Sequence, residues 1–139
     1  MDLDTAREVA AKFFSKSGDI KELAGERNPN FLVTTTHGKF VLKIHSSEEV
    51  SQIQIQQSAL AALEQVNKFQ TPTTVPANSG ELLVDIGEGK FARMLTWIDG
   101  DLWSQSEDLD ESHKSQLGRL VATVDSKLAT VDCTNFRAT

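Results

Sequence analysis

The sequence has one cysteine, no long apolar run and no cluster of basic residues. The single cysteine, Cys133, cannot form an internal disulfide, so nothing indicates an oxidising compartment. No stretch approaches the roughly 18 consecutive apolar residues of a membrane span, and the acidic residues 1–4 do not resemble a secretory signal. We therefore expect a cytoplasmic protein that does not enter a membrane.

The lack of a basic cluster also limits the possible partners. The net charge of the 139 residues is −6, and the lysines and arginines are spread along the chain. Because nucleic-acid-binding proteins present a concentrated basic surface, we expect no nucleic-acid partner. The 39% hydrophobic and 24% charged residues are typical of a globular chain, long enough for one domain with its own core.

Common catalytic and metal-binding motifs are absent as well. None of His37, His45 and His113 is followed two positions later by aspartate, and their spacing does not suit zinc. There is no Gly-x-Ser-x-Gly motif. Residues 87–90, Gly-Glu-Gly-Lys, are not a P-loop, because Val84 stands where its first glycine is required. We expect no catalytic residue and no metal site in this chain.

Hydrophobic periodicity predicts helices and strands in a mixed order. The predicted helices span about 5–16, 49–67 and 109–131, and the predicted strands span 20–23, 31–35, 39–44, 82–86 and 91–97. This order favours an α+β fold, in which a long helix packs on a five-stranded antiparallel sheet and two further helices lie at the ends of the chain. Unrelated α+β domains share the order, so motifs must identify the function.

Lys43 lies in the middle of the apolar strand segment Val41-Leu42-Lys43-Ile44. Burying an ammonium group costs several kcal/mol unless an anion meets it. Strand alternation places Val41 and Lys43 on one face. In kinases, a small apolar residue covers adenine and a lysine two positions later contacts the α- and β-phosphates. The alternative is a lysine that protects an edge strand from aggregation.

Two weaker segments flank this strand. In the loop over residues 25–30, Asn28 and Asn30 offer amide donors and Gly25 offers backbone freedom, although no G-x-G-x-x-G is present. The segment 93–100 is a strand that runs into a turn, where free backbone groups suit adenine. An ordinary polar hairpin loop and a core strand that ends at a glycine are the respective alternatives.

Taken together, residues 25–44, 56–63 and 93–100, followed by the helical sequence Leu-Gly-Arg-Leu-Val-Ala at 117–122, resemble the aminoglycoside phosphotransferase (APH) family. The similarity is greatest to its hydroxylysine-kinase-like branch. The resemblance implies a protein-kinase-like N-terminal lobe over residues 1–100 with a hinge at 95–100. Residues 101–139 would then form a linker and the first helix toward a C-terminal lobe.

The resemblance also implies ligands and residue roles. ATP would be the cofactor, with Mg²⁺ held mainly by the C-terminal lobe, and a small-molecule alcohol would be the phosphoryl acceptor. Gln56 stands where related kinases have the glutamate that pairs with the strand lysine, and its carbonyl could hold the ammonium without charge. The implied nucleotide-binding residues are Lys43, Val41, Asn28, Asn30, Gln56, Leu95, Thr96 and Ile98.

The sequence therefore predicts the ATP-binding lobe of a small-molecule kinase, which ends before the catalytic loop and is inactive by itself. One alternative is a stand-alone binding or regulatory module with the same fold. Another is an unrelated α+β protein-interaction domain. An exposed inter-lobe surface, comprising Trp97, Trp103 and the apolar stripe of residues 117–128, would favour a homo-oligomer.

Overall fold

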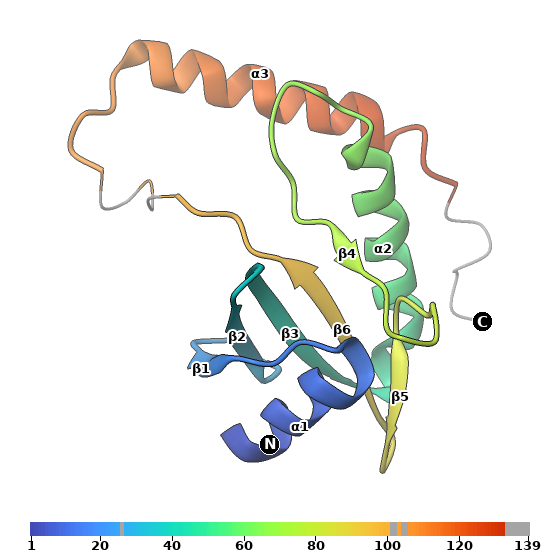
Figure 1. Cartoon of the computed structure of the whole chain (residues 1–139). Coiled ribbons are helices and arrows are strands. Elements are labelled where there is room, and N and C mark those ends of the chain that lie inside the picture. Colours follow the sequence, from blue (N-terminus) through green and yellow to red (C-terminus); the bar gives the residue numbers. More distant parts are fainter. Residues whose placement is uncertain (26, 101–102, 104–105, 133–139) are drawn as a thin grey trace.

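Three strands follow the first helix, three more follow the second, and a third long helix comes last (Figure 1). The computed structural model describes residues 1–25, 27–100, 103 and 106–132. Cys133 and parts of the predicted linker lie outside the described residues. The elements are α1 (Leu3–Phe14), β1 (Asp19–Leu23), β2 (Asn30–Thr35), β3 (Gly38–Ser46), the 3₁₀ helix η1 (Ser47–Glu49), α2 (Val50–Glu64), β4 (Thr74–Val75), β5 (Val84–Gly87), β6 (Lys90–Thr96) and α3 (Glu111–Leu128).

The strands form one antiparallel sheet with the order β1-β2-β3-β6-β4, and β5 also pairs with β6. β6 is therefore central: β3 runs along one side, and β5 and β4 pair with the start and the end of its other side. The predicted α+β fold is confirmed. The sequence missed β4, a two-residue strand that lies between Pro72 and Pro76, because proline normally interrupts strand pairing.

Helix α1 covers one face of the sheet and supplies much of the core. Ala6, Val9, Ala10 and Phe14 are buried against the sheet, whose largest fully buried side chains are Phe31, Leu42, Met94 and Val33. Alanines allow the helix backbone to approach the strands closely. The helix begins earlier than predicted because Asp2 caps it: Asp2 Oδ1 accepts a hydrogen bond from the Thr5 N–H at 2.8 Å.

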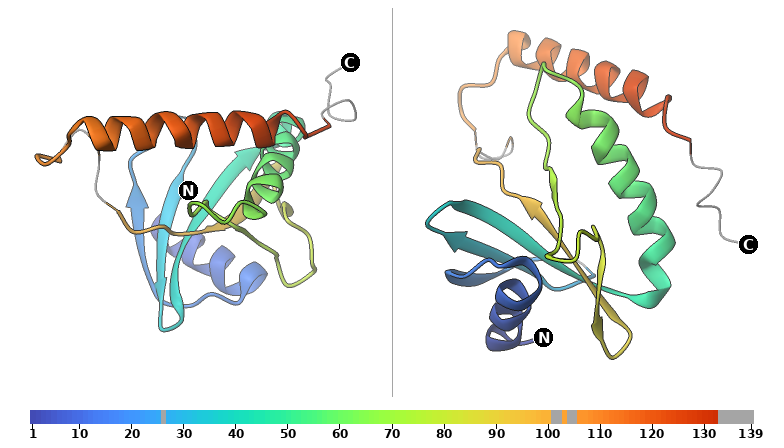
Figure 2. Two further views of the ribbon diagram at one scale, coloured as in Figure 1. Left: turned by 90° about the horizontal axis from the view of Figure 1, so that it is seen from above. Right: turned by 45° about the vertical axis from the view of Figure 1, so that its right-hand side comes forward.

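Helices α2 and α3 lie away from α1 (Figures 1 and 2). The predicted long helix, α2, buries Ile53 and Gln57, and the Gln57 amide donates to the Leu82 carbonyl at 3.1 Å. α3 crosses above the sheet, and its C-terminal end meets the C-terminal end of α2 (Figure 2). There the Lys127 ammonium donates to Gln65 Oε1 at 3.0 Å. None of the described helices is both long and apolar enough to cross a lipid bilayer.

Candidate functional site

Strand β3 divides its side chains between the two faces of the sheet. Leu42 and Ile44 belong to the core beneath α1, so alternation places Val41, Lys43 and His45 on the opposite face. The strand register extends this pattern sideways into two rows. Lys43 lies opposite Asn30 of β2 and Arg93 of β6, whereas Val41 lies opposite Leu32 and Leu95. An apolar row thus borders a polar, positively charged row.

A cavity of about 370 Å³ opens on this face. Apolar residues from β1, β3, β6 and the α2–β4 connector line most of it, and Lys43 is its cation. It brings together six of the eight residues that the sequence implied: Asn30, Val41, Lys43, Leu95, Thr96 and Ile98. It also includes four residues that the sequence analysis did not assign to nucleotide binding: Leu23, Ala24, Pro72 and Trp97.

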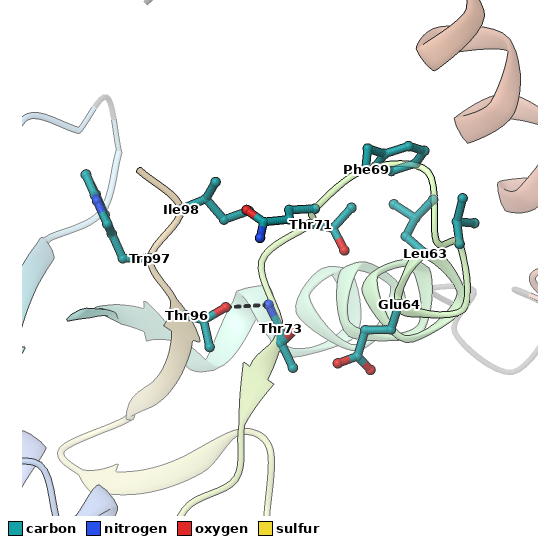
Figure 3. Close-up of a pocket in the computed structure, with 10 residues that line it drawn as sticks. Leu63, Glu64, Phe69, Thr71, Thr73, Thr96, Trp97 and Ile98 are labelled. Carbon is teal, nitrogen blue, oxygen red and sulfur yellow. Dashed lines mark hydrogen bonds between the residues drawn. The ribbon is translucent and has the colours of Figure 1, made fainter. Parts of the chain in front are cut away.

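The end of β6 is held by hydrogen bonds on both sides. The Trp97 N–H donates to the Lys39 carbonyl at 3.1 Å, and the Thr96 N–H donates to the Thr73 carbonyl at 2.9 Å. Thr96 Oγ1 also accepts from the Thr73 N–H at 2.9 Å (Figure 3). Because the Thr96 N–H is already bonded, the carbonyl is the backbone group that Thr96 can still present to a ligand. The N–H of Ile98 makes no hydrogen bond to another described residue.

A second hollow, of about 380 Å³, adjoins the same strand end (Figure 3). It shares Thr96, Trp97 and Ile98 with the first cavity and is otherwise lined by α2 and the connector that follows it. Trp97 projects to the opposite side of the chain from Thr71, and its indole N–H donates to Asp99 Oδ1 at 3.0 Å. The segment 96–98 therefore forms a wall common to both hollows.

The Lys43 side chain is half-buried, and its ammonium group makes no hydrogen bond or ion pair with any other described residue. Burial lowers the pKa of its ammonium group, and the positive charge of Arg93 lowers it further. Both effects oppose the charged form of the lysine. An anionic ligand that reached the cavity would counteract both.

Two of the implied residues lie outside the cavity. The Asn28 amide donates to Glu49 Oε1 at 2.8 Å. Gln56 Oε1 accepts from Arg93 Nη2 at 2.7 Å, so Gln56 contacts Arg93 instead of Lys43. The sheet order explains this difference, because β6 separates β3 from β4, the strand that α2 contacts. Gln56 on α2 therefore meets the guanidinium on β6 and not the ammonium on β3.

Arg93 and His45 form a buried polar pair that the sequence did not reveal. Arg93 is 4% exposed, and its Nε donates to His45 Nε2 at 3.2 Å. His45 Nδ1 lies 3.9 Å from Glu49 Oε2. Burial, and then the charge of Arg93, lower the pKa of His45 to about 4, although Glu49 acts in the opposite direction. The sequence signal that could have identified Arg93 is the one used for Lys43, a cationic residue within an apolar strand.

Comparisons with known proteins bear on the family and the fold of this chain. A sequence model of the phosphotransferase enzyme family, APH, matches residues 19–138. A comparison with curated proteins gives no match. Among solved structures, the microcompartment-associated aminopropanol kinase has a TM-score of 0.68 at 22% identity, over 90% of this chain and 40% of its own.

Two aminoglycoside-phosphotransferase structures are also similar. Spectinomycin phosphotransferase APH(9)-Ia, in complex with ADP and spectinomycin, has a TM-score of 0.66 at 10% identity, over 87% of this chain and 36% of its own. A thermostable mutant of APH(4)-Ia has a TM-score of 0.56 at 16% identity, over 91% and 39%. The chain thus spans 36–40% of the length of these structures, which at such identities show a shared fold. Because the family model matches nearly the whole sequence, the chain belongs to the phosphotransferase enzyme family APH.

Proposed function

We propose that this chain forms the ATP-binding lobe of a cytoplasmic small-molecule kinase. The whole kinase would transfer the γ-phosphoryl group of ATP to an alcohol. The observation that supports this most directly is the cavity in which Lys43 lies beside the apolar row and the end of β6. Membership of the APH family removes support for the alternative of an unrelated protein-interaction domain.

The residues of the cavity suit the parts of ATP. Its volume of about 370 Å³ is within the usual range of small-molecule sites. Val41 and Leu95 offer apolar surface to an adenine ring, while the Thr96 carbonyl and the Ile98 N–H offer an acceptor and a donor. Lys43, which has no anionic partner among the described residues, suits the phosphates.

The chemical step requires groups that this sequence does not supply. No histidine is followed two positions later by aspartate, so we assign the catalytic base and the Mg²⁺ ligands to a C-terminal lobe. Residues 95–100 would be the hinge, and 101–139 would lead to that lobe. The names of an aminopropanol kinase and of a spectinomycin phosphotransferase bound to ADP support a nucleotide and a small alcohol as ligands.

A titration with Mg·ATP, followed by amide NMR shifts, tests this proposal. We expect shifts at residues 25–31, 41–43 and 95–98 in the wild-type chain, and weaker binding by at least tenfold in Lys43→Ala, since the phosphate contact is lost. Lys12→Ala is the matched control, because Lys12 lies on α1 at the other face of the sheet. Shifts confined to other regions would contradict the proposed site. Phosphoryl transfer by this chain alone, abolished in Lys43→Ala, would contradict its predicted inactivity.

A further inference from the structure

Arg93 is a buried cation without a buried anion. The side-chain groups that accept its hydrogen bonds are neutral: Gln56 Oε1 at 2.7 Å and His45 Nε2 at 3.2 Å. Its Nη1 is buried and has no partner, and no carboxylate of the described residues lies within 4.0 Å of its guanidinium. Burying an unpaired charge costs several kcal/mol, so such an arrangement requires an explanation.

The charge of Arg93 adds to that of Lys43. The two residues are direct partners in the β3–β6 register and lie on the same face of the sheet. Cross-strand partners have their Cβ atoms about 5 Å apart, and like charges at this distance repel each other. Two adjacent cations without a carboxylate therefore create a strongly positive region beside the cavity.

The Glu49 carboxylate makes its hydrogen bonds to groups other than Arg93 and Lys43. Glu49 accepts hydrogen bonds from the Asn28 amide and from the Ser46 N–H, both at 2.8 Å. His45, whose Nε2 faces Arg93, stands between that carboxylate and the guanidinium. Gln56, at the position where a glutamate would supply a charge, supplies a neutral carbonyl instead. The positive charges of Arg93 and Lys43 thus remain available to a ligand.

We propose that Arg93 is a positioning residue of an oligophosphate site, the second and buried cation behind Lys43. The Arg93 guanidinium donates its hydrogen bond to Gln56 of α2, which leaves the Lys43 ammonium free for a ligand. The charge of Arg93 also adds to the attraction for each additional phosphate. This inference rests on the proposed nucleotide site and extends it: the site distinguishes ligands by phosphate number as well as by base.

Calorimetry on the whole 139-residue chain can separate these contributions. We would measure the affinities for adenosine, AMP, ADP and inorganic pyrophosphate, without added magnesium, in the wild type, Arg93→Met, Arg93→Lys and Gln56→Glu. We expect Arg93→Met to weaken ADP and pyrophosphate roughly tenfold while adenosine changes less than about twofold. Arg93→Lys, which retains the charge, is expected to retain most of the phosphate affinity.

Gln56→Glu provides a test that leaves Arg93 in place. Its carboxylate can accept the same hydrogen bond and neutralises the guanidinium, so we expect weaker ADP binding with adenosine binding unchanged. If Arg93→Met does not fold, Gln56→Glu alone tests whether the charge of Arg93 contributes to phosphate binding. An unchanged ratio of ADP to adenosine affinity in Gln56→Glu and in folded Arg93→Met would overturn the role of Arg93 but leave the nucleotide site intact. Pyrophosphate binding that depends on Arg93, without adenosine binding, would support the oligophosphate site and contradict the proposed ATP site.

Discussion

At the scale of single residues, His45 links the buried network to pH. Its pKa of about 4 in the folded chain lies below the usual 6.5, so the unfolded chain binds more protons between these values. His45 therefore does not reduce the free energy of unfolding above about pH 6.5, and this free energy falls as the pH is lowered toward 4. We expect the free energy of unfolding to decrease by roughly 1–2 kcal/mol between pH 7 and pH 5, as measured by urea denaturation.

Replacement of His45 should flatten this dependence. His45→Gln retains a hydrogen-bonding side chain but does not titrate, so its unfolding free energy should change little between pH 7 and pH 5. The exposed His37 provides the matched control, and His37→Gln should retain the slope of the wild type. Equal slopes in His45→Gln and the wild type would show that another group dominates this pH range.

Gly18 is required because β1 begins close to the backbone of β2. A Cβ at this position would lie 1.9 Å from the Thr34 carbonyl oxygen, so a side chain would force the strands apart. We expect Gly18→Ala to lower the free energy of unfolding by about 1–3 kcal/mol. Gly118 is the matched control: it lies on exposed α3 with open space around it, and Gly118→Ala should raise stability by up to about 1 kcal/mol. Thermal and urea unfolding would measure both changes.

The sequence predicted the site residues to different extents. Val41 and Lys43 were predictable because strand alternation is a local property, and the cavity does contain them. The contact of Gln56 with Arg93 was not, because it depends on β6 lying between β3 and α2, a long-range arrangement. The roles of these residues in binding remain predictions.

At the scale of secondary-structure elements, β4 is held to β6 by few interactions. Thr96 contributes twice, through its N–H to the Thr73 carbonyl and through Oγ1, which accepts from the Thr73 N–H. Thr96→Val retains the shape of the side chain but removes that acceptor, at a cost of about 1 kcal/mol. We expect hydrogen exchange at the Thr73 amide to become roughly fivefold faster.

The opposite side of β6 supplies an internal control for this experiment. The Trp97 amide donates to Lys39 of β3, so its exchange rate in Thr96→Val should match the wild type. If the Thr73 amide is equally protected in both proteins, the hydroxyl does not secure the strand.

Most elements were predictable because hydrophobic periodicity determines them. The predicted start of α1 is about two residues too late, because the hydrogen bond from the Thr5 N–H to Asp2 starts the helix at Leu3. Its end was also misplaced, because Ser15 adopts a left-handed conformation with φ 53° and serves as the C-cap, so the helix ends before Gly18. Such cap choices depend on single hydrogen bonds, which periodicity does not contain.

At the scale of the whole molecule, α3 exposes a broad apolar surface. Leu117, Leu120 and Val121 remain exposed, and a hollow of about 600 Å³ lies between α3, Phe69 and Trp103. We expect this surface to cause self-association at high concentration, seen as a concentration-dependent sedimentation coefficient. Leu117→Gln combined with Leu120→Gln should reduce it, whereas Leu3→Gln on α1 should not. A strictly monomeric wild-type chain would contradict this expectation.

The division of β3 between two faces has an evolutionary consequence. Positions 42 and 44 belong to the core under α1, while positions 41 and 43 line the cavity. Under the proposed function, adjacent codons would therefore be subject to different selection, positions 42 and 44 for the folded core and positions 41 and 43 for nucleotide binding. A change at position 43 would then remove nucleotide binding while the core at positions 42 and 44 still folds.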